Sequence, residues 1–350
     1  MTSSMLAAVL HGTKDLRVES RPRPEATPGS VVLRVRRAGV CGSDVHYFNE
    51  GRCGSFAVTA PFIIGHEFSA EVVAVGDGVR NLAIGQHVVA NPAWQCGQCD
   101  YCRAGRGNLC RNVRMLGSAS TQPHTDGAFC EYLRLTADQC YPIPEKMDLG
   151  IAALMEPFAV GMHALSCAGS VVGKRVLVTG GGAIGLVTAI AARAVGATTV
   201  AVSDPVEERR NMALTVGADA ALDPTAPDYQ DQVTKLTDDG FDVVLEASGA
   251  PPALKGAFTT TRRGGTIVQI GTISVPEVAL PVNLIMVREL HIVGSFRYGN
   301  VWPAAVRLVS SGRVDLKPLI TQVLPLRQAA EAVALAGSRS GVVKVQLDFT

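Results

Sequence analysis

The strongest constraint on the fold is an alternation of buried strands and helices between Lys174 and Ser295. Five apolar runs rich in β-branched residues are separated by segments long enough for helices; they cover residues 175–179, 199–202, 241–245, 265–270 and 290–294. Continuous apolar runs of this kind are typical of parallel strands that are covered by helices on both faces. We therefore expect an α/β domain built on a doubly wound parallel sheet.

A glycine-rich turn follows the first of these strands. Residues 180–185 read Gly-Gly-Gly-Ala-Ile-Gly, a G-x-G-x-x-G motif that opens a helix. Such glycines let the backbone approach a pyrophosphate at the helix N-terminus, and Asp204, which closes the next strand, can accept hydrogen bonds from both ribose hydroxyls. The residues predicted to bind a dinucleotide are Gly180, Gly182, Ala183, Ile184, Gly185, Asp204 and Arg209.

Asp204 also bears on which dinucleotide is used. A carboxylate at this position would repel the 2′-phosphate of NADP, so the sequence favours NAD. Arg209 and Arg210 follow closely and could compensate for that repulsion, so NADP is a possible cofactor as well. Alternatively, both arginines lie on a solvated helix face and do not contact the cofactor.

The first third of the chain, from Met1 to Tyr141, has a different pattern. Short alternating apolar and polar runs such as 31–36 and 71–75 are punctuated by Gly and Pro, which predicts a β-rich domain with tight turns. The alternation at 342–345 suits this domain better than the parallel sheet, so we expect the chain to return to it. The expected division is 1–156 with 296–350 for the β-rich domain and 157–295 for the nucleotide-binding domain.

Four closely spaced cysteines give the most specific local signal. Cys96, Cys99, Cys102 and Cys110 can surround a tetrahedral zinc with no open position, which makes the predicted site structural. Four reduced core cysteines are an alternative, but this loop is polar and includes Gln98 and Asp100. A zinc ribbon that binds nucleic acid would need a wider basic surface than the local arginines provide.

A second metal site is predicted from three separate segments. Cys41 lies just after an apolar run, His66 lies in Gly65-His66-Glu67, and Glu156 lies in an otherwise apolar segment. Because a buried carboxylate needs a partner, a zinc bound by Cys41, His66 and Glu156 would explain all three residues. Three protein ligands and an open fourth position are typical of a catalytic zinc. A small core hydrophobe is the alternative interpretation of Cys41.

Composition limits the class of partner and the location. The formal net charge is only +1, from 32 basic and 31 acidic residues, so we expect a small-molecule partner and neither nucleic acid nor membrane. Residues 1–10 lack the pattern of a secretory signal, and the apolar run 176–192 is broken by glycines. The cysteine number is odd, nine, and four of them fall within fifteen residues, which fits metal ligation in a reducing cytoplasm better than a framework of disulfides.

Together these motifs resemble the zinc-containing medium-chain dehydrogenases over essentially the whole chain. The resemblance rests on Cys41-Gly42-Ser43-Asp44-Val45-His46, on Gly65-His66-Glu67, on the cysteine quartet and on the glycine turn with Asp204. It implies a GroES-like catalytic domain and a Rossmann domain. Glu156-Pro157 resembles the polyol dehydrogenase branch, which has a glutamate where alcohol dehydrogenases have a cysteine ligand.

Two kinds of polyol dehydrogenase compete as the best match. Segments 91–92, 117–119 and 123–127, with the quartet, resemble L-idonate 5-dehydrogenase, whereas 296–298, Asn300 and 302–303 resemble sorbitol dehydrogenase. The metal loops favour the idonate enzyme slightly; sorbitol/L-iditol 2-dehydrogenase or xylitol dehydrogenase is the alternative. Either would transfer hydride between a secondary alcohol and NAD(P). A nucleotide-sensing protein without turnover is a third hypothesis, which the presence of Ser43 and His46 beside all the ligands disfavours.

The resemblance also implies roles for individual residues. Ser43 would hydrogen-bond the reacting oxygen and pass its proton through the cofactor ribose to His46, which is otherwise a loop histidine without a role. Glu67 would coordinate zinc, exchange with Glu156 or water, or orient His66. The predicted substrate contacts are Tyr47, Arg297 and Tyr298, although a surface salt bridge would also explain Arg297. The family resemblance further implies a homodimer or homotetramer.

Overall fold

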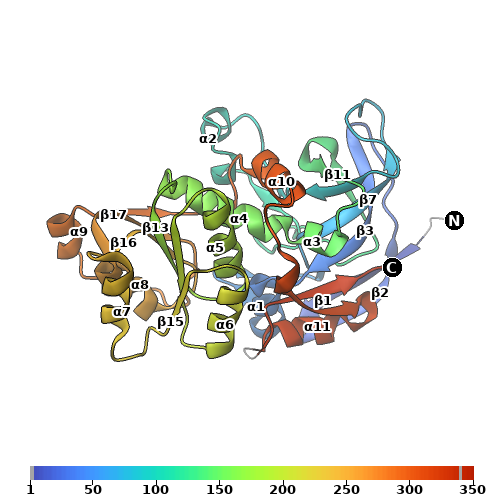
Figure 1. The fold of residues 1–350 in the computed structure, drawn as a ribbon. Helices are drawn as coiled ribbons and strands as arrows, with labels where there is room; N and C mark the ends of the chain where they lie inside the picture. Colours follow the sequence, from blue (N-terminus) through green and yellow to red (C-terminus); the bar gives the residue numbers. More distant parts are fainter. Residues whose placement is uncertain (1–3, 339–340) are drawn as a thin grey trace. The chain divides into compact units, whose positions relative to one another are not determined.

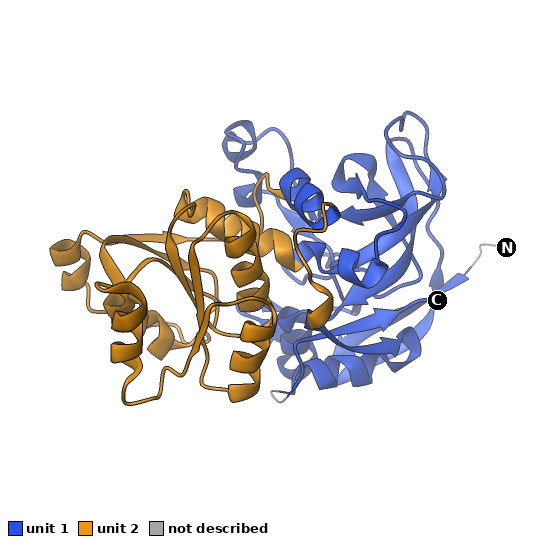
Figure 2. Ribbon diagram, in the orientation of Figure 1, with its two compact units in different colours: residues 1–156, 302–310, 319–350 blue, residues 157–301, 311–318 orange. Residues whose placement is uncertain are grey.

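The computed structural model describes residues 4–338 and 341–350, which form two compact units (Figures 1 and 2). Unit 1 comprises 1–156, 302–310 and 319–350, and unit 2 comprises 157–301 and 311–318. We expected the chain to return to the β-rich domain at residue 296. In the structure, residues 296–301 and 311–318 belong to unit 2 instead. The pattern of the last strand indicates which sheet it joins, but it does not indicate where the preceding segment leaves the other unit.

Unit 1 is built mainly from strands. Its strands are β1 (Ser4–Gly12), β2 (Asp15–Pro22), β3 (Ser30–Gly39), β4 (Arg52–Cys53), β5 (Phe56–Ala57), β6 (Phe62–Ile63), β7 (Glu67–Val75), β8 (His87–Ala90), β9 (Ala93–Trp94), β10 (Arg114–Met115), β11 (Tyr132–Thr136), β12 (Cys140–Pro142), β19 (Ile320–Pro325) and β20 (Lys344–Asp348). Its helices include α1 (Gly42–Glu50), α2 (Asp100–Arg103), α3 (Leu149–Ala153), α10 (Trp302–Ser310) and α11 (Ala329–Ala336).

The main sheet of unit 1 is centred on β3. Its order is β12-β8-β7-β3-β20-β19, with β11 also paired to β3. β20 lies antiparallel to β3, so the last strand joins the β-rich unit as predicted. This pairing brings the end of the chain next to the start of α1 and the start of β7, because Gly39 is opposite both Gln346 and Glu67.

Unit 2 contains the predicted parallel sheet. Its order is β15-β14-β13-β16-β17-β18, and every pair is parallel. The strands are β13 (Arg175–Thr179), β14 (Thr199–Ser203), β15 (Ala220–Leu222), β16 (Phe241–Glu246), β17 (Thr261–Gln269) and β18 (His291–Gly294). The short strand β15 was not among the five expected, because only Ala220–Leu222 pair and two of them are alanines.

Helices cover both faces of this parallel sheet, as Figure 1 shows. They are α4 (Met155–Ala168), α5 (Ala183–Ala194), α6 (Glu207–Thr215), α7 (Tyr229–Thr237), α8 (Pro251–Thr260) and α9 (Asn283–Arg288). The core beneath α7 and α8 includes Leu177, Val244 and Phe258, all fully buried. Burial on both faces explains why the strand sequences are continuously apolar.

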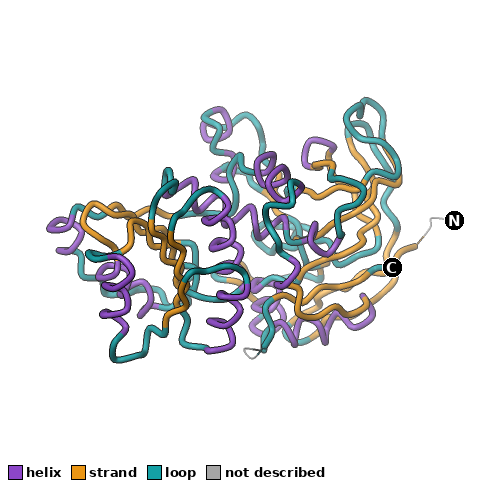
Figure 3. The backbone as a smooth tube through the Cα atoms, viewed as in Figure 1, coloured by secondary structure: helices purple, strands orange, loops and turns teal. Residues whose placement is uncertain are grey.

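Long loops connect the strands of unit 1 (Figure 3). The segment 91–131 contains only two short strands and one short α-helix, and it carries the cysteine quartet. Within the described ranges, no helix is both long enough and apolar enough to span a bilayer.

Candidate zinc and cofactor sites

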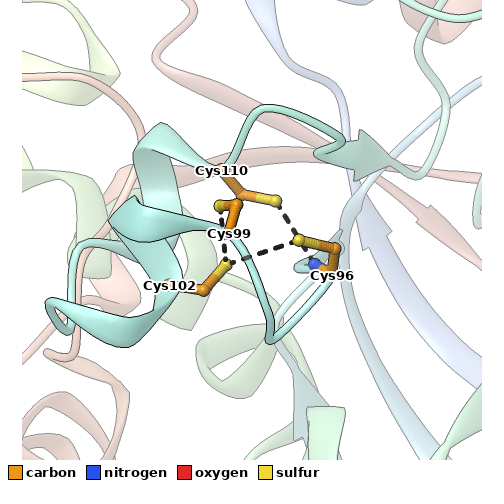
Figure 4. A group of neighbouring side chains, drawn as sticks. All are labelled: Cys96, Cys99, Cys102 and Cys110. Carbon is orange, nitrogen blue, oxygen red and sulfur yellow. Dashed lines mark hydrogen bonds between the residues drawn. The ribbon is translucent and has the colours of Figure 1, made fainter.

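The cysteine quartet gathers in the loop of unit 1. Cys99 precedes α2 and Cys102 lies within it, while Cys110 follows a short 3₁₀ helix at Gly107–Leu109. Figure 4 shows the four sulfurs facing one another. The Sγ atoms of Cys99 and Cys102 are 3.5 Å apart, those of Cys96 and Cys102 are 3.9 Å apart, and all four lie within 4.8 Å of one another.

This arrangement fits a tetrahedral zinc. Zinc–sulfur bonds of about 2.3 Å at tetrahedral angles place neighbouring sulfurs about 3.8 Å apart. The N–H groups of Gln98 and Cys99 lower the pKa of Cys96 to about 6, whereas desolvation and the neighbouring thiols raise the pKa of Cys102 to about 12. Cys110 Sγ accepts from the N–H groups of Cys96 and Asn112. With four sulfur donors no coordination position is left for a substrate, so the site is structural in character.

A second group of metal-ligating atoms lies at the junction of α1 and β7. Cys41 is the N-cap of α1, His66 immediately precedes β7, and Glu67 is the first residue of β7. One ligand atom from each of these three residues lies within 4.8 Å of the others. Thiolate, imidazole and carboxylate are donors that zinc accepts, and this set could leave a position open for an exchangeable ligand.

The turn before His66 is packed too tightly for any side chain. Gly65 has φ +90°, and a Cβ there would lie 2.1 Å from a ring carbon of Phe129. A Cβ on Gly127 would in turn lie 2.3 Å from the carbonyl oxygen of Gly65. This close packing fixes the backbone from which His66 projects.

Asp44 connects the two segments that carry Cys41 and His66. It is completely buried, and its two oxygens accept from the Cys41 N–H at 2.9 Å and the Gly65 N–H at 3.1 Å. Burial raises the pKa of Asp44, while His66 and these two N–H groups act in the opposite direction. Asp44 therefore closes the first turn of α1 and also holds the turn before His66.

His66 is buried among acidic groups. Burial by itself lowers the pKa of His66, but Cys41, Asp44 and Glu156 raise it well above the ordinary value. Its Nδ1 is buried and has no hydrogen-bond partner within the described part of the chain. A buried polar nitrogen in that state is costly unless a ligand satisfies the ring, so the imidazole fits a metal site.

Glu156, the third predicted ligand, is also buried at this site. It lies in the first turn of α4, is 5% exposed, and acts electrostatically on both His66 and Lys344. The group of atoms within 4.8 Å contains Glu67 and not Glu156. Which carboxylate completes the zinc ligands therefore remains a prediction.

Lys344 is the site residue that sequence reasoning missed. Its Nζ lies 2.8 Å from both oxygens of Glu67 and donates to the Val40 carbonyl oxygen at 3.0 Å. The side chains of Lys344 and Glu67 are only 4% and 1% exposed. Burial lowers the pKa of Lys344, but Glu67 and Cys41 raise it above its usual value. Lys344 therefore neutralises Glu67, the carboxylate that lies beside Cys41 and His66.

The other residues predicted for catalysis lie on α1. Ser43 is half-buried, and His46 has a side chain that is 54% exposed, with its Nδ1 2.9 Å from Glu50 Oε1. Tyr47 is buried, and its hydroxyl oxygen accepts from the Ala119 N–H at 3.2 Å. The roles of Ser43 and His46 in catalysis, and of Tyr47 in substrate binding, remain predictions.

In unit 2 the glycine turn forms the start of α5, with Gly182 as N-cap and Ala183 and Ile184 in the first turn. A Cβ on Gly185 would lie 1.7 Å from the Gly180 carbonyl oxygen, so only glycine allows this turn. Asp204 is buried, and its Oδ2 accepts from the Gly181 N–H at 2.8 Å and lies 3.5 Å from Arg209 Nη1. A cradle of backbone N–H groups with an acidic residue beside it fits a dinucleotide.

Arg297 and Tyr298, the other predicted substrate contacts, belong to unit 2. Arg297 has φ +55° and its guanidinium lies over the Phe296 ring, 4.8 Å from the centroid. Tyr298 is almost completely buried. Their contact with substrate remains a prediction.

Both units match known family models. Residues 27–145 match the alcohol dehydrogenase GroES-like domain, and residues 183–311 match the zinc-binding dehydrogenase domain. A sorbitol dehydrogenase from Bacillus subtilis (strain 168) is 37% identical over 334 residues, which are 95% of this chain and 94% of the relative. These matches confirm the expected GroES-like and parallel-sheet architecture.

Solved structures agree over the full length. L-Idonate 5-dehydrogenase from Escherichia coli has a TM-score of 0.94 at 32% identity, covering 100% of this chain and 99% of its own. A zinc-binding dehydrogenase from Sinorhizobium meliloti 1021 bound to NADP has a TM-score of 0.90 at 34% identity, covering 99% and 100%. The chain is therefore an oxidoreductase with zinc and NAD(P) as cofactors, and it belongs to the zinc-dependent medium-chain dehydrogenases, in their polyol dehydrogenase branch.

Proposed function

We propose that this enzyme oxidises a secondary alcohol of a sugar acid or polyol, with an L-idonate-like sugar acid as the preferred substrate. The observation that carries the proposal is the group of half-buried Cys41 with buried His66 and Glu67, together with the similarity to L-idonate 5-dehydrogenase. Sorbitol, L-iditol or xylitol is the alternative substrate, and the sorbitol dehydrogenase from Bacillus subtilis supports it equally.

Cys41 and His66, with Glu156 or Glu67 as the carboxylate ligand, would hold a zinc ion. That zinc would supply Lewis-acid chemistry, which lowers the pKa of the substrate hydroxyl. Ser43, half-buried on the first turn of α1, hydrogen-bonds the reacting hydroxyl, accepts its proton and at the same time releases its own hydroxyl proton toward His46. His46 is exposed on the same helix and delivers that proton to solvent, with Glu50 orienting its ring.

A substrate panel tests the proposal. Purified zinc-loaded enzyme is assayed with L-idonate, sorbitol, xylitol and L-threonine, and kcat/KM is compared. The highest value with L-idonate is expected; the highest value with sorbitol or xylitol would support the alternative. Absence of turnover with every compound, in protein that retains two zincs per chain and binds NAD(P), would refute the proposed substrate class.

The proton relay is tested separately. His46→Ala is expected to lower turnover and change its pH profile, since the imidazole that passes the proton to solvent is lost. Glu50→Gln removes the partner of His46 but leaves the imidazole, so it is expected to lower turnover less than His46→Ala. If His46→Ala leaves turnover and pH profile unchanged, the relay does not operate.

We propose NAD as the preferred cofactor because the Asp204 carboxylate faces the Gly181 N–H at the cofactor cradle. Asp204→Asn is expected to lower the KM for NADP relative to that for NAD. A wild-type enzyme with lower KM for NADP would refute the preference and would assign phosphate binding to Arg209, which lies 3.5 Å from Asp204.

We further propose a homodimer or homotetramer in the cytoplasm. Helix α9, its N-cap and the edge strand β18 that follows carry exposed apolar side chains: Val282, Met286, Val287 and Ile292. Apolar patches of this kind mark protein interfaces, and nine free cysteines suit a reducing compartment. Light scattering is expected to give two or four chains per particle; a monomer would refute the proposal.

A further inference from the structure

A fully buried carboxylate lies at the carboxyl end of the parallel sheet in unit 2. Glu246 ends β16 and is 0% exposed, although Ser248, two residues later, is exposed. In the sheet register it lies between Thr179, which ends β13, and Gln269, which ends β17. The three polar side chains therefore form a row across the ends of adjacent strands.

Donors surround both oxygens of this carboxylate. Oε1 accepts from the N–H groups of Ser248 at 2.8 Å and Gly249 at 3.0 Å, from the Ser248 hydroxyl, and from the Thr179 hydroxyl at 3.4 Å. Oε2 accepts from the Gly249 N–H at 3.2 Å and from Gln269 Nε2 at 2.7 Å. None of these contacts requires a proton on the carboxylate, so the arrangement suits an ionised Glu246 that is compensated by neutral donors alone.

These hydrogen bonds fix the turns 247–250 and 270–272, which are packed so closely that their glycines cannot be replaced by residues with a side chain. A Cβ on Gly271 would lie 2.3 Å from the Gly249 nitrogen and 3.0 Å from Glu246 Oε2, and a Cβ on Gly249 would lie 2.3 Å from the Thr272 carbonyl oxygen. A Cβ on Gly180 would lie 2.9 Å from the backbone of Ser248. The turns after β13, β16 and β17 are thus packed around the carboxylate.

The position of Glu246 in the sheet relates it to the cofactor. The strand order reverses between β13 and β16, and dinucleotides bind at such a reversal, outside the carboxyl ends of the strands. The pyrophosphate cradle at 180–185 follows β13, so the turns after β16 and β17 lie on the other side of the reversal, toward the nicotinamide end.

We propose that Glu246 is a positioning residue for the nicotinamide: it holds the turns 247–250 and 270–272 in place and supplies a buried negative charge that favours the oxidised cofactor. The nicotinamide ring is cationic when oxidised and neutral when reduced, so a nearby fixed anion stabilises only the oxidised form. The inference depends on the NAD(P) cofactor of this family and not on which alcohol is the substrate.

The test measures binding of the oxidised and reduced cofactor without any alcohol. Glu246→Gln removes the charge at nearly constant size, and the dissociation constants of zinc-loaded wild type and variant are determined by calorimetry. The constant for the oxidised form is expected to rise by about fivefold or more relative to that for the reduced form, the scale expected for loss of one unit charge close to the ring. Because no substrate is present, failure of the polyol assignment would not affect this result.

Asp242→Asn is the matched control. Asp242 is near the amino end of the same strand, where it accepts from the Arg175 N–H at 2.8 Å and forms an ion pair with Arg262. Its neutralisation is expected to leave the ratio of the two dissociation constants within twofold of wild type. An equal change in that ratio for both variants would overturn the proposal.

Glu246→Asp separates charge from geometry. It retains the negative charge but shortens the side chain, so both forms of the cofactor should bind more weakly while their ratio stays near that of wild type. If Glu246→Gln does not fold, Ser248→Ala and Gln269→Leu each remove one donor and leave the charge. Each should weaken binding of both forms at least threefold, and unchanged binding in both variants would overturn the proposal.

Discussion

Replacing Lys344 with methionine would leave Glu67 as a buried carboxylate without its cationic partner. The two side chains are 4% and 1% exposed, and Lys344 Nζ is 2.8 Å from each Glu67 oxygen. Methionine has a similar length and apolar character along its stem, so the substitution removes the ammonium group without opening a large cavity.

Lys344→Met is expected to lower the free energy of unfolding substantially. Removing one member of a buried ion pair destabilises proteins by about 3–5 kcal/mol, because the remaining charge stays buried and uncompensated. Protonation of Glu67 or rearrangement toward water would reduce this cost, so about 3 kcal/mol is the expected loss for unit 1 in zinc-free protein. The double variant Lys344→Met/Glu67→Gln, which buries no charge, should recover most of the loss.

Urea unfolding, monitored by tryptophan fluorescence, measures the stability of unit 1. Both tryptophans of the chain, Trp94 and Trp302, belong to unit 1, so their emission reports on that unit. With an m-value of about 3 kcal/mol per M, a loss of about 3 kcal/mol lowers the urea midpoint by about 1 M.

An exposed ion pair of the same unit provides the control. Arg17 and Asp15 form a bidentate pair with side chains that are 61% and 39% exposed, and solvent screening makes the contribution of such exposed pairs to stability small. Arg17→Met should therefore shift the midpoint far less than Lys344→Met. Equal shifts for the two variants would refute the reasoning that burial makes the Lys344–Glu67 pair strong.

The remaining predictions concern metal and cofactor. Cys96→Ser is expected to lower zinc from two to one per chain by metal analysis, because three sulfurs and a hydroxyl hold zinc poorly; two retained zincs would count against the structural site. Gly185→Ala should weaken NAD(P) binding at least about tenfold in a calorimetric titration, because its Cβ would lie 1.7 Å from the Gly180 carbonyl oxygen. Unchanged binding would show that the glycine turn does not bind the cofactor. Gly39→Ala places a Cβ 2.3 Å from Glu67 Oε2, so chelator competition should show weaker zinc binding, about tenfold, at the second site; an unaltered affinity would show that Glu67 does not support it.

Local spacing alone determined several features of this protein. The cysteine quartet and the glycine turn are each formed by residues close together in the chain, so their geometry is limited by a short stretch of backbone. The parallel sheet was equally predictable, because burial on both faces produces continuous apolar strands regardless of what surrounds them.

Only the tertiary structure decided which groups surround Cys41 and His66. Lys344 reaches Glu67 across a sequence separation of 277 residues, because β20 pairs with β3 and β3 pairs with β7. In the sequence, Lys344 is one polar residue in an alternating strand, and the same pattern would fit a lysine exposed to solvent. Its burial follows from strand order in a sheet, a long-range property that no local pattern contains.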